Sequence, residues 1–128
     1  MTNTKSLIKG IGQVSIPVRR LNESADFYRD VLGLQELFRM NNMALFDCGG
    51  IHLLLGIAEK PEFDHKSSII YFNVDSIHEA YDRLCSAGVT FTSAPHKVGD
   101  LGTVEIWLAF FTDPDDNVHA IRSEISKS

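Results

Sequence analysis

The sequence contains an internal repeat, and this repeat constrains the fold more than any other feature. Residues 11–57 and 68–122 show the same predicted order of elements: a strand, a helix and three further strands. Equivalent positions keep an offset of 56 residues, as between Gln13 and Ile69 or between Tyr28 and Leu84. Gly33 and Gly88 differ by 55, so one residue is lost near the end of the second helix. A repeat of this length predicts two copies of one βαβββ module.

The first module begins with an alternating segment. Val14 and Ile16 alternate with polar residues, which predicts a half-buried strand over residues 11–18, and Pro17 indicates that this strand lies at a sheet edge or ends there. Apolar residues at helical spacing follow, and Gly33 is a typical stop for the predicted helix. Three strands are then predicted at residues 37–40, 43–48 and 51–57, separated by turns at Asn41-Asn42 and Gly49-Gly50.

The second module begins with a strand over residues 68–74. Ser76 and Glu79 have the spacing of a capping box, so a helix is predicted to begin there and to stop at Gly88. The remaining predictions are strands at 89–92, 103–111 and 118–122, a flexible polar loop at 93–102, a turn at 113–117, and a frayed tail from Ser123.

Two such modules imply a particular architecture. A sheet with a helix on one side leaves its other side bare, and two bare sides can form a common concave surface. The predicted fold is therefore α+β, with two tandem βαβββ modules whose curved mixed sheets enclose a shared cavity. We expect residues 1–128 to form a single domain, with a linker at about 58–67.

Composition excludes several classes of partner. The formal net charge is −5, which disfavours nucleic acid and anionic membranes as partners. No apolar segment is long enough to span a bilayer, and residues 1–9 lack the apolar region of a signal peptide, so we expect a cytoplasmic protein. Cys48 and Cys85 are too few for a disulfide framework and are expected to be reduced thiols.

Three motifs in this order resemble those of the vicinal oxygen chelate superfamily. They are Ser24–Leu34 in the first helix, Tyr71–Asp75 leading to Ala87-Gly88-Val89, and Phe110–Asn117 near the end. Asp116 stands where the family usually has glycine, which predicts a positive φ there. The superfamily includes glyoxalase I, extradiol dioxygenases, fosfomycin-resistance thiol transferases and metal-free bleomycin-binding proteins, so the fold alone leaves the function open.

The resemblance also implies where a metal would be held. Its four ligand positions fall on Gln13, Leu54, Ile69 and Ala120, and three of these side chains cannot coordinate an ion. We therefore predict no catalytic metal, with Gln13 as the one family-position residue able to ligate. A displaced site could use Gln13 and His52, but the sequence pattern gives it no carboxylate. His119 has the opposite strand parity and should point toward a helix.

Strand parity predicts the lining of a ligand cavity. Tyr71 and Phe110 could stack on a planar molecule or simply pack in the core, and Arg122 could meet a carboxylate or phosphate or end a strand in solvent. Trp107 should pack under a helix or at a subunit contact. The loop at 93–103, which contains His96, could act as a lid. The predicted cavity residues are Gln13, Ser15, His52, Leu54, Ile69, Tyr71, Leu108, Phe110, Ala120 and Arg122.

Together these features predict a small-molecule-binding protein of the glyoxalase/bleomycin-resistance type, without a cofactor. No nucleophile with a visible base partner appears. The resemblance implies a homodimer whose modules pair within one chain or across the dimer. One alternative is a lyase, isomerase or dioxygenase with nickel, zinc, iron or manganese in a displaced site. The other is an interaction module without a ligand.

Overall fold

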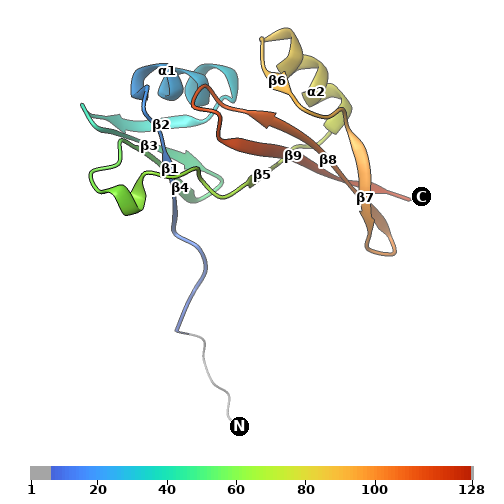
Figure 1. The fold of residues 1–128 in the computed structure, drawn as a ribbon. Coiled ribbons are helices and arrows are strands. Elements are labelled where there is room, and N and C mark those ends of the chain that lie inside the picture. The colour runs from blue at the N-terminus through green and yellow to red at the C-terminus, as the bar shows by residue number, and fades with distance from the viewer. Residues whose placement is uncertain (1–6, 128) are drawn as a thin grey trace.

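The structure is a computed structural model that describes residues 7–127, and it confirms an α+β fold built of two modules (Figure 1). The first module forms a four-stranded sheet, sheet A, in the order β1-β4-β3-β2. The second forms a five-stranded sheet, sheet B, in the order β5-β9-β8-β6, with β7 also paired to β8. Both sheets are mixed, because β1 is parallel to β4, β5 is parallel to β9, and the other pairs are antiparallel.

The strands of sheet A are β1 (Gln13–Pro17), β2 (Gln35–Arg39), β3 (Met43–Cys48) and β4 (Ile51–Gly56). Those of sheet B are β5 (Ile70–Asn73), β6 (Thr90–Phe91), β7 (His96–Asp100), β8 (Val104–Thr112) and β9 (Val118–Ser126). The helical segments are α1 (Leu21–Asp26), its π-helical continuation η1 (Phe27–Val31), the short 3-10 helix η2 (Pro61–Phe63) and α2 (Ile77–Ser86).

The two helices begin in different ways and each is followed by a glycine. The Ser76 hydroxyl accepts the backbone N–H of Glu79 at 3.3 Å, which confirms the predicted cap of α2. The first helix has no side-chain cap, and the chain just before it is held by the second module, where the Asp115 carboxylate accepts the backbone N–H of Arg19 at 2.9 Å. Gly33 and Gly88 follow the two helices with φ of 77° and 91°, a conformation that favours glycine.

Each helix packs against the sheet of its own module through one apolar core. Ala25 and Tyr28 pack with Ile16, Phe46 and Leu55 between the first helix and sheet A. A second core lies between α2 and sheet B. Its buried members are Ile77, Val89, Ala109, Phe111 and Ile121, and Phe27, Val31 and Leu32 of the first helical segment pack against it. The two modules therefore share apolar surface on the side of the helices.

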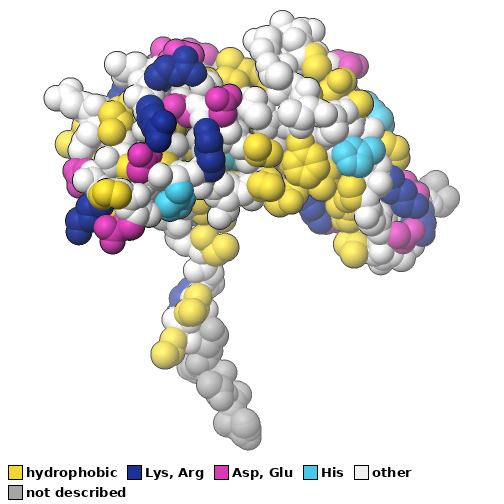
Figure 2. Space-filling model, in the orientation of Figure 1, with side chains coloured by type: hydrophobic (Ala, Val, Ile, Leu, Met, Phe, Trp, Pro, Cys, Tyr) yellow, Lys and Arg dark blue, Asp and Glu magenta, His cyan; other side chains and the backbone are white. Residues whose placement is uncertain are grey.

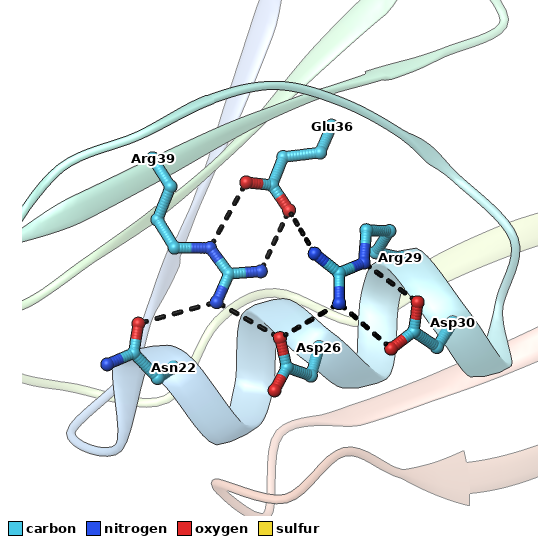
Figure 3. A network of polar contacts seen from close by, with 6 residues as sticks. All are labelled: Asn22, Asp26, Arg29, Asp30, Glu36 and Arg39. Atoms are coloured by element: carbon cyan, nitrogen blue, oxygen red, sulfur yellow. Dashed lines mark hydrogen bonds and ion pairs between the residues drawn. The ribbon is translucent and has the colours of Figure 1, made fainter.

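A network of ion pairs attaches β2 to the first helix (Figure 3). The Arg39 guanidinium donates to both carboxylate oxygens of Glu36, at 3.1 and 2.8 Å, and lies 3.0 Å from an Asp26 oxygen. Arg29 joins the same group through Asp26, Asp30 and Glu36. This network covers the part of β2 where the pairing with β3 is irregular, between Glu36 and Phe38.

The turn at residues 113–117 connects the modules through buried polar contacts. The Asn117 side chain donates to Pro17 O and to an Asp113 oxygen, both at 3.0 Å, and accepts the Ser67 backbone N–H at 3.0 Å. Asp116 has a φ of 64°, which confirms the positive φ expected where the family has glycine. Because Asn117 is fully buried, these hydrogen bonds fix the turn against the first module.

Two predictions for the second module were wrong. Residues 96–100 form β7, which pairs with β8, so this part of the predicted loop is a strand, and its role as a lid stays a prediction. The strand predicted to end at Arg122 continues to Ser126, because β8 offers pairing partners back to Val104. The expected position of Pro17 on an edge strand is confirmed by the order of sheet A. Among residues 7–127, no helix is long and apolar enough to cross a membrane.

Candidate functional site

Each sheet has one side turned away from its helix, which we call its open face. On sheet A, Gln13 lies opposite His52, and Ser15 lies opposite Leu54, so these four predicted residues share the open face. Figure 1 shows the two sheets side by side, with both helices on the same side of them.

Of the other six predicted residues, five belong to sheet B and Ile69 lies beside it. Tyr71 lies opposite Ala120, Ala120 opposite Phe110, and Arg122 opposite Leu108, so they form a second open face. Ile69 comes directly before β5, shares the parity of Tyr71 and is exposed. The predicted cavity is thus divided into a group of four residues and a group of six.

A polar row crosses the open face of sheet A. Gln13, His52, Asp47 and Gln35 are consecutive partners across β1, β4, β3 and β2. Sequence reasoning found Gln13 and His52 but missed the other two, although Ala44 and Phe46 alternate with Asp47 in β3 and are buried against the helix. The row can offer amide, imidazole and carboxylate groups to one ligand.

Next to this row the same face is hollowed. A depression of about 190 Å³ is lined by Ser15 and Leu54 from the predicted set and by Met43 and Phe63, which the sequence did not indicate. Met43 is the first residue of β3 and lies on the open face, and Phe63 comes from η2 in the linker. The depression is too small for most organic ligands by itself, since such pockets usually measure 300 Å³ or more.

The open face of sheet B is aromatic. The rings of Tyr71 and Phe110 lie edge to face with centroids 6.2 Å apart, and Tyr71 is 47% exposed. Hydrophobic side chains gather over β5, β9 and β8 in Figure 2, with a histidine beside them. His96 belongs to this group because β7 places it opposite Leu108, with its ring 6.4 Å from that of Phe110.

The hydrogen bond of His96 identifies one of its donors. Its Nδ1 lies 2.8 Å from Ala94 O, and a carbonyl can only accept, so Nδ1 carries a hydrogen. In the neutral form of the ring this leaves the lone pair of Nε2 for a donor on a ligand. The hairpin that orients His96 had a visible sequence signal, because Asp100 and Gly102 are turn residues. Gly102 N–H donates to the Asp100 carboxylate at 2.8 Å, and Gly102 has a φ of 96°.

Arg122 is engaged within its own sheet. Its guanidinium lies 3.0 Å from a Glu124 carboxylate oxygen and donates to Asn73 Oδ1 at 3.2 Å. Because β9 continues to Ser126, Arg122 lies inside a strand and is not the solvated strand end that the sequence left open. An anionic ligand at this position would have to compete with Glu124.

The residues at the four metal positions of the family do not fit a catalytic divalent ion. Gln13 is the only one with a donor atom, because Leu54, Ile69 and Ala120 carry hydrocarbon side chains. Residues 7–127 also contain no group of three or more His, Cys, Asp and Glu side chains that could hold a metal ion. We therefore derive no chemical step through a metal at these positions.

His119 and Trp107 lie on the helix side of sheet B, as their parity predicted. Trp107 packs against the second core, and its ring lies 5.4 Å from that of His78 on α2. The Tyr28 hydroxyl donates to Asp113 at 2.6 Å, so its oxygen accepts from His119 Nε2 at 2.8 Å. Burial lowers the pKa of His119 to about 4. His119 is thus a neutral link between the modules and takes no part in the open faces.

Comparisons with known proteins agree with this fold. The chain is 31% identical over 120 residues to the uncharacterized protein YraH of Bacillus subtilis, a match that covers 83% of this chain and 91% of YraH. It is 41% identical over 49 residues to the metallothiol transferase FosB of Staphylococcus haemolyticus, a match that covers 38% of this chain and only 35% of FosB.

A solved structure gives the same result. The crystal structure of a glyoxalase/bleomycin resistance protein/dioxygenase superfamily member from Sphaerobacter thermophilus superposes with a TM-score of 0.75 at 25% identity, covering 93% of this chain and 100% of that one. The sequence model of the same superfamily matches residues 10–121. The chain therefore belongs to the glyoxalase/bleomycin resistance protein/dioxygenase superfamily, which confirms the resemblance seen in its motifs.

Proposed function

We propose that the open faces bind a small, planar organic molecule and that this binding needs no catalytic metal. The observation that carries the proposal is the aromatic group on sheet B. Tyr71 and Phe110 present ring surface, and His96 offers an acceptor at its edge. Aromatic surface with a few directed polar groups is typical of sites for organic ligands.

The polar row of sheet A adds hydrogen-bonding groups to the aromatic surface of sheet B. Gln13, His52 and Asp47 could hydrogen-bond the polar edge of a ligand whose planar part lies on Tyr71. Within one chain these surfaces lie side by side (Figure 1). We therefore infer a homodimer in which sheet A of one copy faces sheet B of the other, so that each complete site has walls from both copies. Exposed Ile69, Tyr71 and Val118 support this arrangement, because pairing would remove them from water.

A thermal-shift screen of planar aromatic compounds, run in the presence of a chelator, tests the proposal. A compound that binds only the folded protein should raise Tm, since it adds RT ln(1 + [L]/Kd) to the stability. Tyr71→Ala should abolish the shift, whereas Leu101→Ala, which removes another exposed apolar side chain at the tip of the β7–β8 hairpin, should preserve it. Compounds that shift both variants equally would place the site elsewhere, and an absence of any shift across the screen would favour an interaction module.

A metal-dependent enzyme with a displaced site is the second candidate, and one observation favours it. The register places Asp47 beside His52, so the row contains the carboxylate that the sequence pattern lacked. Gln13, His52 and Asp47 together form a mixed nitrogen and oxygen donor set. The similarity to FosB, named a metallothiol transferase, points in the same direction for a part of the chain.

Calorimetric titration with nickel, zinc, iron and manganese separates the two candidates. The metal-dependent alternative requires one ion per chain, with binding lost in both His52→Ala and Asp47→Asn. His65→Ala, which removes an exposed histidine of the linker, is the matched control. Binding that disappears in the first two variants and survives in the third would replace the metal-free proposal.

A further inference from the structure

A second hollow lies on the helix side of the molecule, between the two modules. It measures about 610 Å³, within the range of sites for organic ligands. One wall is formed by Leu32 and Leu34 after η1. The other is formed by Leu84 of α2 and by Ala87 at its C-terminal end, and Phe72 of β5 and the following Val74 form the floor. We call this hollow the intermodule cleft. Its floor residues have the parity opposite to Tyr71, so it is separate from the open faces.

The width of the intermodule cleft is set by contacts outside it. Tyr28 is hydrogen-bonded to Asp113 at 2.6 Å, and the Ser24 hydroxyl donates to Asp115 at 2.6 Å, which fixes the first helix against the second module. The cleft wall at Leu32 is also the end of a π-helical turn, since Leu32 N–H donates to Phe27 O at 3.0 Å. Such turns are frequent at functional sites, because they displace side chains from the regular helical pattern.

The two charged side chains at the rim of the cleft, Asp30 and Arg83, differ in how closely they are paired. Asp30 is paired with Arg29, which donates to its two oxygens at 2.8 and 3.1 Å and holds the pKa of Asp30 below its usual range. Arg83 has a much weaker partner, since its guanidinium lies 3.8 Å from Glu79 and makes no hydrogen bond to any residue between 7 and 127. The cleft therefore combines an apolar interior with one cation whose donors remain available.

We propose that the intermodule cleft is a second ligand site, which takes a small amphipathic carboxylate. The hydrocarbon part of the ligand lies on Phe72, Val74 and Leu84, and its carboxylate pairs with Arg83 at the mouth. The cleft suits a small molecule, because the covalent chain and the contacts of Tyr28 and Ser24 hold the two modules together and so limit its width. The site is independent of the ligand proposed for the open faces.

A thiol inside the cleft makes the proposal testable. Cys48 lines it and is half-buried, and burial raises the pKa of this thiol, so it reacts slowly and its reaction rate reports access to the cleft. In a Cys85→Ser background, which removes the exposed thiol, alkylation of Cys48 by iodoacetamide is followed with and without decanoate below its micelle concentration. Decanoate should slow the alkylation in a saturable way, and calorimetry should give the same affinity.

Two variants within the cleft and two controls outside it separate this site from the open faces. Ala87→Trp, which fills the cleft from an exposed position, should abolish both the protection and the calorimetric signal, while circular dichroism verifies folding. Arg83→Gln should weaken decanoate about threefold and leave decanol unchanged, the size expected of an exposed charge pair. Arg19→Gln, which removes an equally exposed arginine elsewhere, and Tyr71→Ala on the open face should change neither.

Any of three results would overturn the proposal. One is alkylation that decanoate does not slow, or that it slows equally in Ala87→Trp. Another is protection of Cys48 that rises with protein concentration in the absence of decanoate, which would make the cleft an interface between copies. Loss of protection in Tyr71→Ala alone would assign decanoate to the open face and also remove the second site.

Discussion

Contacts of single residues hold the two modules together. Tyr28 is fully buried, and its hydroxyl lies between the Asp113 carboxylate and the His119 imidazole, at 2.6 and 2.8 Å. Burial and the neighbouring Asp113 raise the pKa of the Tyr28 phenol, so it stays protonated and donates to Asp113. The contact joins residues 85 positions apart in the sequence, so it exists only when both modules are folded together.

Removal of this hydroxyl should therefore destabilise the whole chain. In Tyr28→Phe, Asp113 loses a donor and His119 Nε2 loses its acceptor, while both groups stay buried. The expected loss is about 1–3 kcal/mol in the free energy of unfolding, measured by urea denaturation. Tyr71→Phe, which removes a hydroxyl from a half-exposed ring, is the control and should change stability little. Equal losses of stability in the two variants would mean that the buried hydrogen bonds of Tyr28 contribute no more than an exposed hydroxyl does.

His119 should make the stability depend on pH. Its pKa is about 4 in the folded protein and about 6.5 in the unfolded chain, so the unfolded state binds the proton first as the pH falls. The contribution of His119 to the free energy of unfolding is therefore complete above about pH 7, declines as the pH falls through 6.5, and levels off below about 4. The decline between about pH 7 and 5 should amount to about 2 kcal/mol.

The comparison of wild type with His119→Gln isolates this effect. Glutamine keeps a donor toward Tyr28 but does not titrate, so the variant should lose less stability than the wild type over the same pH range. Urea denaturation at each pH measures both proteins. A constant difference between them from pH 7 to 5 would contradict a neutral, buried imidazole.

At the scale of elements, β2 depends on side chains as well as on its ladder. Its pairing with β3 is irregular, and Arg39 attaches it to the first helix through Glu36 and Asp26 (Figure 3). Arg39→Met, which keeps a long apolar side chain, should lower Tm by a few degrees at low salt. Because the pairs are partly exposed, the difference from wild type should shrink in about 1 M salt, as thermal unfolding at both salt concentrations would show. A salt-independent difference would indicate lost packing instead of lost charge pairing.

The elements that the sequence predicted well are those with local signals. Gly33 and Gly88 marked the ends of both helices, and Gly49-Gly50 marked a turn that the structure confirms with positive φ at both residues. β7 was missed because its residues 96–100 are mostly polar and lack alternation, so the strand depends on pairing with β8. The length of β9 depends on the same partner, since a strand extends as far as its neighbour offers hydrogen bonds.

The candidate site was likewise predicted where local pattern was sufficient and missed where strand pairing decides. Parity alone placed Gln13, His52 and Tyr71 on the sides of the sheets away from the helices. It could not align one strand with the next, so Asp47 was not recognised beside His52. Nor could it show that the ten predicted residues divide between two sheets, because this follows from how the modules pack.

For the whole molecule, the proposed pairing of two copies makes a prediction about its interface. Val118 is on the open face of sheet B and is 37% exposed, and Val98 on the outer strand β7 is 49% exposed. Val118→Glu should convert a dimer into monomers, since it places a charge in the proposed interface, whereas Val98→Glu should leave the dimer intact. Sedimentation equilibrium measures this. A wild-type monomer at all concentrations, or dimers in both variants, would rule out the proposed pairing.

The central claim is that the open faces bind an organic ligand with the groups of the protein alone. Calorimetric titration of the best compound from the screen, into wild type before and after treatment with a chelator and into Tyr71→Ala, tests it most directly. We expect the same Kd with and without the chelator and an affinity at least about tenfold weaker in Tyr71→Ala, a loss of about 1.4 kcal/mol. Binding that vanishes with the chelator and returns when a divalent metal is added would contradict it.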